Sequence, residues 1–163
     1  MTELGKKKFF CQNDIFFYMK YTLAILFSLL VQLGVAQANS VLITEAQSLL
    51  SCEPLSVMQK SVVPASGNKH DYMSLARYFW PNPDTQDGLP YVNRDGVTNP
   101  EIERYDRNAL GTTAERVITL TQAWQQTADE RYAAKATELL RVWFLDKATH
   151  MNPNLLYAQM VPG

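Results

Sequence analysis

Between residues 69 and 80 the chain gathers cationic and aromatic side chains, which can bind anionic groups and stack on flat rings. Lys69 and Arg77 carry positive charge, and the guanidinium of Arg77 can hold a carboxylate through two parallel hydrogen bonds. Tyr72, Tyr78 and Trp80 supply flat faces for sugar rings. Each aromatic taken alone is better explained by core packing. Because charges are interleaved with the rings, we predict that the cluster as a whole lines a groove.

A second polar cluster lies near the end of the sequence, in Asn152-Pro153-Asn154 and the residues that follow. Asn154, Tyr157 and Gln159 carry groups that hydrogen-bond to hydroxyls and carboxylates. We predict that Asn154 and Gln159 contact a ligand. An equally open interpretation is that these side chains cap loops and helices.

Metal chemistry is not indicated by the spacing of the possible ligands. The acidic and amide residues around Gly88 and Gly96 lack the spacing of a calcium loop, and two Asp-Gly steps explain them as turns. The two histidines, His70 and His150, lack the paired Cys or His partners of a zinc site. We therefore expect no metal and no cofactor.

Four segments together resemble the alginate lyase family of secreted polysaccharide lyases. They are HDYMSLARYFWPNPDTQDGLPYVNRDGVTN at 70–99, WFLD at 143–146, MNPNLLYAQ at 151–159 and PG at 162–163. The resemblance covers about residues 60–163. It implies an all-α fold, part of an incomplete α/α toroid of antiparallel helix hairpins with a long aromatic-rich loop.

The resemblance also implies a reaction, the β-elimination of a uronate-containing polysaccharide such as alginate, with the cluster after residue 151 on the groove side. The family uses Asn, His, Arg and Tyr for this chemistry. Its Asn-Asn-His motif is not found, since neither His70 nor His150 follows an asparagine. We therefore leave the catalytic residues unassigned and expect an N-terminal fragment that is inactive alone. The alternative is a non-catalytic carbohydrate-binding or helical-repeat interaction module.

Two amphipathic helices are predicted after Asp106, which is a suitable N-cap. The first repeats its apolar face at Leu110, Ala114, Val117, Thr121 and Trp124, and the second at Tyr132, Ala136, Leu139, Leu140 and Trp143. Thr127 and Glu130 have the spacing of a capping box, which places the break near residues 127–129. The helices should form an antiparallel hairpin. Periodicity alone does not distinguish a toroid from a helical solenoid. The family resemblance favours the toroid.

Elsewhere, Pro54 should interrupt the broken helical pattern of residues 44–59. Asp87-Gly88 and Asp95-Gly96 flank Leu89–Arg94, which predicts a short hairpin with Tyr91 exposed.

The N-terminal 38 residues are expected to be absent from the mature protein. Leu23–Val31 is a short apolar run after Lys20, and Ala36-Gln37-Ala38 fits a signal peptidase site. Residues before Met19 are interpreted as a wrongly assigned start. The predicted division is then a leader at residues 1–38, made of the wrongly assigned start and the signal peptide, and a truncated lyase-like domain at residues 39–163. A single-pass anchor is the less favoured alternative, and we expect a periplasmic or secreted protein with no stable membrane anchor after cleavage.

Charge fits this interpretation without deciding it. The leader contains four lysines and two acidic residues, so its removal changes the net charge from −1 to −3. The sequence has no basic stripe for nucleic acid, and a polyanion needs positive charge only in its groove. The predicted partner is an acidic polysaccharide. Cys52, the single mature cysteine, is interpreted as a free packed thiol.

Overall fold

The computed structural model describes the backbone of residues 3–163 and the side chains of residues 22–34, 37 and 39–163. The chain divides into two compact units, Met1–Thr44 and Glu45–Gly163. The first is formed by the long helix α1 (Glu3–Leu49), which ends in the second unit. Within the described residues, Thr22–Leu49 is long and apolar enough to cross a membrane, with a mean hydropathy of 1.7, as a signal sequence also can be. The cleavage site after Ala38 stays a prediction.

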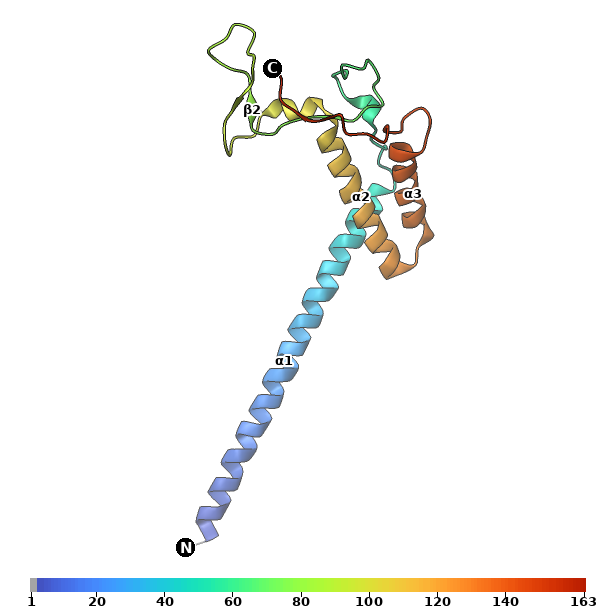
Figure 1. Cartoon of the computed structure of the whole chain (residues 1–163). Coiled ribbons are helices and arrows are strands. Elements are labelled where there is room, and N and C mark those ends of the chain that lie inside the picture. Colours follow the sequence, from blue (N-terminus) through green and yellow to red (C-terminus); the bar gives the residue numbers. More distant parts are fainter. Residues whose placement is uncertain (1–2) are drawn as a thin grey trace. The chain divides into compact units, whose positions relative to one another are not determined.

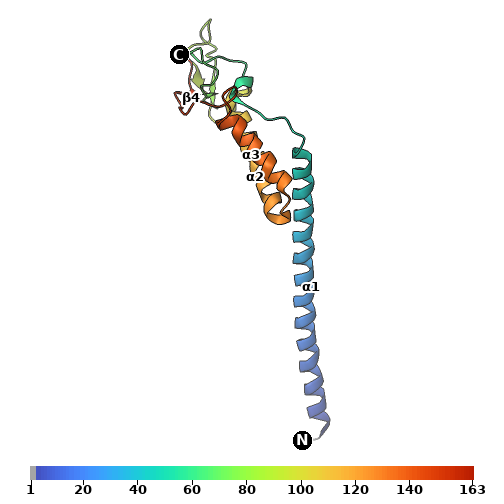
Figure 2. The ribbon, with the colours of Figure 1, turned by 90° about the vertical axis from the view of Figure 1, so that its right-hand side faces the viewer.

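The second unit is built on two packed helices, α2 (Asp106–Thr127) and α3 (Glu130–Phe144). They lie side by side and run in opposite directions (Figures 1 and 2). The predicted break is confirmed, because Ala128 takes a left-handed φ of 54° and ends α2. The predicted caps are wrong in detail. Asp129, rather than Thr127, caps α3 by accepting the Arg131 N–H, and Asp106 is the first helical residue rather than the N-cap of α2.

The buried face of α2 is rotated by about one residue from the predicted face. The side chains that α2 buries are Asp106, Thr113, Leu120 and Ala123, whereas Ala114 is exposed and Trp124 is 38% exposed. Thr113 is polar and its hydroxyl donates to the Ala109 carbonyl at 2.8 Å, so a rule based on apolar residues does not select it. In α3 the prediction holds for Tyr132, Ala136, Leu139 and Trp143, which are buried, but Leu140 is 42% exposed.

The segment 70–99, expected as one long irregular loop, contains three short strands. They are β1 (Met73–Leu75), β2 (Phe79–Trp80) and β3 (Val92–Asn93), and a fourth, β4 (Tyr157–Met160), lies near the C-terminal end. β1 pairs in parallel with β4, and β2 pairs antiparallel with β3. The fold is therefore predominantly helical, as expected, with two small sheets whose strand pairing the sequence did not predict.

The turns around these strands match the Asp-Gly signals, because Gly88 and Gly96 both have φ of +74°. The predicted hairpin is displaced, since β3 pairs with the upstream strand β2 rather than within residues 89–94. Tyr91 is half-buried rather than exposed, and its hydroxyl donates to Glu101 Oε2 at 2.9 Å. Burial, and then the Glu101 carboxylate, raises the pKa of Tyr91 to about 12.

Two short 3-10 helices complete the second unit, η1 (Val57–Gln59) and η2 (Pro100–Arg104). The predicted interruption of residues 44–59 is seen, but α1 ends at Leu49, before Pro54, and η1 is a separate turn after it. Asn99 is 1% exposed and begins η2, and its side chain also donates to the Phe79 carbonyl at 2.8 Å. This residue therefore fastens β2 to the segment that leads into α2.

Candidate binding cavity

A cavity of about 330 Å³ lies where β1, β2, β4 and the start of α2 meet. It is lined by Ala76, Arg77, Tyr78, Phe79, Arg107 and Gln159. Its volume is within the range of small-molecule sites, about 300–1,000 Å³. Three residues predicted from sequence to bind a ligand, Arg77, Tyr78 and Gln159, are thus brought together although more than 80 positions separate the first from the last.

Backbone hydrogen bonds hold the segments that form the cavity wall. The Ala76 N–H donates to the Met160 carbonyl at 2.9 Å, which joins the end of β1 to β4. The Arg77 carbonyl accepts the Asn99 N–H at 2.9 Å, and the Tyr78 carbonyl accepts the Arg94 N–H at 2.8 Å. Because both carbonyls accept hydrogen bonds from other segments, the side chains at 77 and 78 project from backbone that is fastened to its neighbours.

The lining of this cavity carries two guanidiniums and no carboxylate. Arg107 is the second residue of α2, where the helix macrodipole adds further positive potential. The phenol of Tyr78 and the amide of Gln159 can donate and accept hydrogen bonds. This combination suits a ligand that presents carboxylates among hydroxyls, as an acidic sugar does.

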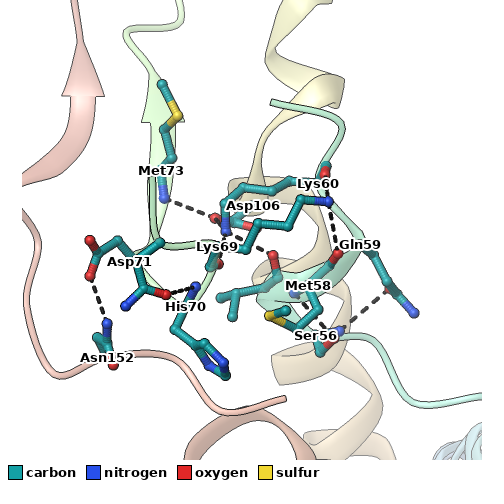
Figure 3. Close-up of polar contacts among 12 residues, drawn as sticks. Ser56, Met58, Gln59, Lys60, Lys69, His70, Asp71, Met73, Asp106 and Asn152 are labelled. Carbon is teal, nitrogen blue, oxygen red and sulfur yellow. Dashed lines mark hydrogen bonds and ion pairs between the residues drawn. The ribbon is translucent and has the colours of Figure 1, made fainter. Parts of the chain in front are cut away.

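A buried ion pair lies at the start of α2, directly before the cavity residue Arg107 in the sequence (Figure 3). Lys60 Nζ lies 3.0 Å from Asp106 Oδ2, with side-chain exposures of 0% and 1%. Lys60 also donates to the carbonyls of Val57 and Lys69, at 2.7 and 2.5 Å, and Asp106 accepts the Met73 N–H at 2.8 Å. Burial raises the pKa of the Asp106 carboxyl, and the Met73 amide and Lys60 ammonium oppose that shift. The pair ties η1, β1 and the start of α2 together.

Asp71 organises a second polar centre, which fixes the loop before β4 (Figure 3). Its Oδ1 accepts from Asn152 Nδ2 at 2.8 Å and from Asn154 Nδ2 at 3.1 Å, and its Oδ2 accepts from Ser66 Oγ at 2.6 Å. These hydrogen bonds, that of Asn152 foremost, lower the pKa of the Asp71 carboxyl. Asn154 therefore has a structural partner, and its predicted ligand contact is not part of the cavity lining.

The remaining predicted residues lie outside the cavity lining. Lys69 Nζ donates to the Lys60 carbonyl at 3.2 Å, Tyr72 is buried at 8% exposure, and Tyr157 is half-buried in β4 beside Met73. Trp80 donates from Nε1 to the Val97 carbonyl at 2.9 Å, and the Arg94 guanidinium carbon lies 5.1 Å from its ring centroid. Lys69 and Trp80 have structural partners, and a role in binding stays a prediction for all four residues.

The two histidines, 80 positions apart, are neighbours in the fold. Their ring centroids are 4.9 Å apart and tilted by 41°. His70 Nδ1 lies 2.6 Å from the His150 carbonyl and His150 Nδ1 lies 3.0 Å from the Asp146 carbonyl, so each Nδ1 must carry the proton. Neither histidine lines the cavity. No group of three or more His, Cys, Asp or Glu side chains suited to a metal ion occurs among the residues whose side chains are described.

Arg107 is the charged cavity residue that was not among the binding residues predicted from sequence. A signal was present, however. A cation in the first turn of a helix is placed against the helix dipole, so an arginine there calls for a separate reason.

Comparison with known proteins identifies the family of the chain. Residues 56–163, well over half of the chain, match the family model for alginate lyase. The structure is similar to the crystal structure of an alginate lyase from Bacteroides ovatus, with a TM-score of 0.76 and 48% sequence identity over 78% of this chain. The match covers 34% of the Bacteroides chain, so this sequence spans about a third of that protein. A search of curated proteins gave no match. On the evidence of the family model and of this structural relative, the chain belongs to the alginate lyase family.

Proposed function

We propose that this chain is the substrate-binding N-terminal part of a polysaccharide lyase that acts on a uronate-containing polysaccharide such as alginate. The observation that carries the proposal is the cavity with two arginines, a phenol and an amide, and no carboxylate in its lining. In a chain whose formal net charge is −1, such a local excess of positive charge favours a polyanionic ligand.

The reaction itself is a β-elimination. A base removes the proton from C5 of the uronate, the electron pair forms a double bond between C4 and C5, and the glycosidic oxygen leaves C4 and takes up a proton. Removal of the C5 proton requires that the neighbouring carboxylate be neutralised, and a guanidinium is suited to that. We assign Arg77 and Arg107 to carboxylate binding, and Tyr78 and Gln159 to the sugar hydroxyls.

The second candidate is a carbohydrate-binding module without catalysis. It is favoured by the cavity lining, which holds binding groups and neither a histidine nor a carboxylate as a base. The two candidates differ in product, since only the lyase generates an unsaturated uronate with its characteristic ultraviolet absorbance. By this reasoning we expect the 163-residue chain to bind and not to cleave.

For the complete fold we propose an incomplete α/α toroid in which α2 and α3 form one helix pair. The hairpin leaves Ile118 57%, Leu140 42% and Phe144 46% exposed, which supports the packing of further helices on it. We propose further that a signal peptide directs export and is removed after Ala38. N-terminal sequencing of the secreted product should begin at Asn39, and a product that retains the apolar helix would favour a membrane anchor instead.

The test of the binding site is titration of the chain with a defined alginate oligosaccharide. Arg77→Ala and Arg107→Ala should each weaken binding roughly 10- to 100-fold, as expected for loss of a charge-assisted hydrogen bond. Arg131→Ala is the matched control, because Arg131 is also the second residue of a helix but pairs with Asp129 at 2.6 Å. Equal binding of a neutral glucan of the same length, or equal loss with all three variants, would refute the site.

A further inference from the structure

Gln159 has a backbone conformation that is unusual for its residue type. Its φ is +52°, in the left-handed region, where a side chain with a Cβ is disfavoured. The pairing of β1 with β4 is irregular at the same place. Met73 is opposite Tyr157 and Leu75 is opposite Met160, so β4 uses one residue more than β1 over this interval. Gln159 thus lies in a bulge of β4.

The bulge is held by a side chain of β1. The Gln159 N–H donates to Ser74 Oγ at 2.8 Å, and Ser74 is only 3% exposed. On the far side of the bulge, the Ala76 N–H donates to the Met160 carbonyl at 2.9 Å and restores the ladder. The Ser74 hydroxyl therefore takes the place of the strand carbonyl that Gln159 would otherwise use.

A bulge of this kind would be formed most readily with glycine, which adopts positive φ without a steric cost. The chain instead has glutamine, which lines the cavity with Arg77 and Arg107. Backbone strain and β-bulges are both common at functional sites, where they fix the direction of one side chain toward a ligand.

We propose that Ser74 is a positioning residue. It holds the backbone of Gln159 in the left-handed conformation so that the side-chain amide of Gln159 contacts the uronate bound in the cavity. The inference rests on the proposed function for its ligand. Ser74 itself is buried and does not contact the ligand. Its effect on binding must therefore pass through Gln159, and that dependence can be measured.

The experiment compares four variants of the full 163-residue chain: Ser74→Ala, Ser74→Thr, Gln159→Gly and the double variant Ser74→Ala/Gln159→Gly. Affinity for an alginate tetrasaccharide is measured by titration calorimetry. Hydrogen exchange of the residue 159 amide is measured by NMR, and thermal unfolding by circular dichroism.

Ser74→Ala should weaken binding about three- to tenfold and speed exchange of the Gln159 amide by a similar factor, as expected for loss of one hydrogen bond. Ser74→Thr keeps a hydroxyl and should restore both. Gln159→Gly should raise the unfolding temperature, since it removes the strain, yet weaken binding about tenfold. In the Gln159→Gly background, Ser74→Ala should change affinity less than twofold.

An equal loss of affinity from Ser74→Ala in both backgrounds would overturn the inference, because Ser74 would then act on the fold in general. Unchanged exchange of the Gln159 amide in Ser74→Ala would also overturn it. If the unsubstituted chain does not bind the tetrasaccharide, the proposed function fails instead, and the amide exchange still decides whether Ser74 holds Gln159. If Ser74→Ala does not fold, Gln159→Gly tests the proposal by itself. A lower unfolding temperature or an unchanged affinity in Gln159→Gly would then refute it.

Discussion

Substitution of Lys60 by Met tests whether the buried ion pair supports the second unit. Met matches the length of the lysine stem but removes the ammonium, which lies 3.0 Å from Asp106 Oδ2. The substitution leaves the Asp106 carboxylate buried without a counter-charge. It also leaves the carbonyls of Val57 and Lys69 without their lysine donor.

The expected loss of stability is about 3–5 kcal/mol, the usual result of breaking a buried ion pair by removing one partner. This is a large share of the roughly 5–15 kcal/mol by which domains are stable. Lys60→Met with Asp106→Asn should recover about 1–3 kcal/mol, because Asn has no charge to desolvate and still accepts the Met73 N–H. The loss in Lys60→Met should also shrink as the pH is lowered, since a protonated Asp106 needs no counter-charge.

The assay is urea unfolding of the full chain followed by circular dichroism. Lys135→Met is the matched control, because Lys135 Nζ lies at the same 3.0 Å from Glu138 and its own side chain is only 10% exposed, whereas the Glu138 side chain is 50% exposed. A surface pair of this kind contributes at most about 1 kcal/mol. Equal losses in the two lysine variants, or no recovery with Asp106→Asn, would refute the view that the Lys60 pair is desolvated and structural.

Three further outcomes are expected. The pKa of the Asp71 carboxyl is lowered below its usual 3.8. Its contribution to stability should therefore be complete above about pH 3.8 and be lost as the pH falls through the lower pKa of the folded state. Asp71→Asn should remove this part of the acid sensitivity in a pH series of thermal melts. The pKa of Tyr91 is raised from 10.0 to about 12, so its contribution to stability should be complete below about pH 10 and be lost as the pH rises through about 12. In an ultraviolet titration, Tyr91→Phe should lack one late-ionising tyrosine, and an unchanged curve would contradict this. His150→Ala should leave oligosaccharide affinity within about twofold, since neither histidine lines the cavity, and a loss as large as that of Arg77→Ala would show that the site is misplaced.

The sequence by itself determined the local elements. Apolar periodicity and turn residues located both helices and the break at residues 127–129, because these features depend on neighbours within a few positions. The chemistry of their side chains selected Arg77, Tyr78 and Gln159 as binding candidates, and the structure brings all three to one cavity.

Long-range pairing was decided only in the tertiary structure. The parallel contact of β1 with β4 joins segments more than 80 positions apart, and strands of three or four residues carry too few residues for a periodic signal. The face that α2 buries depends on which neighbour packs against it, so Trp124 stays 38% exposed while Thr113 is buried. Arg107 joins the cavity for the same reason. Side-chain type states what a residue can do, whereas its partner depends on where the folded chain places it: Asn154 binds Asp71, and Gln159 remains at the cavity.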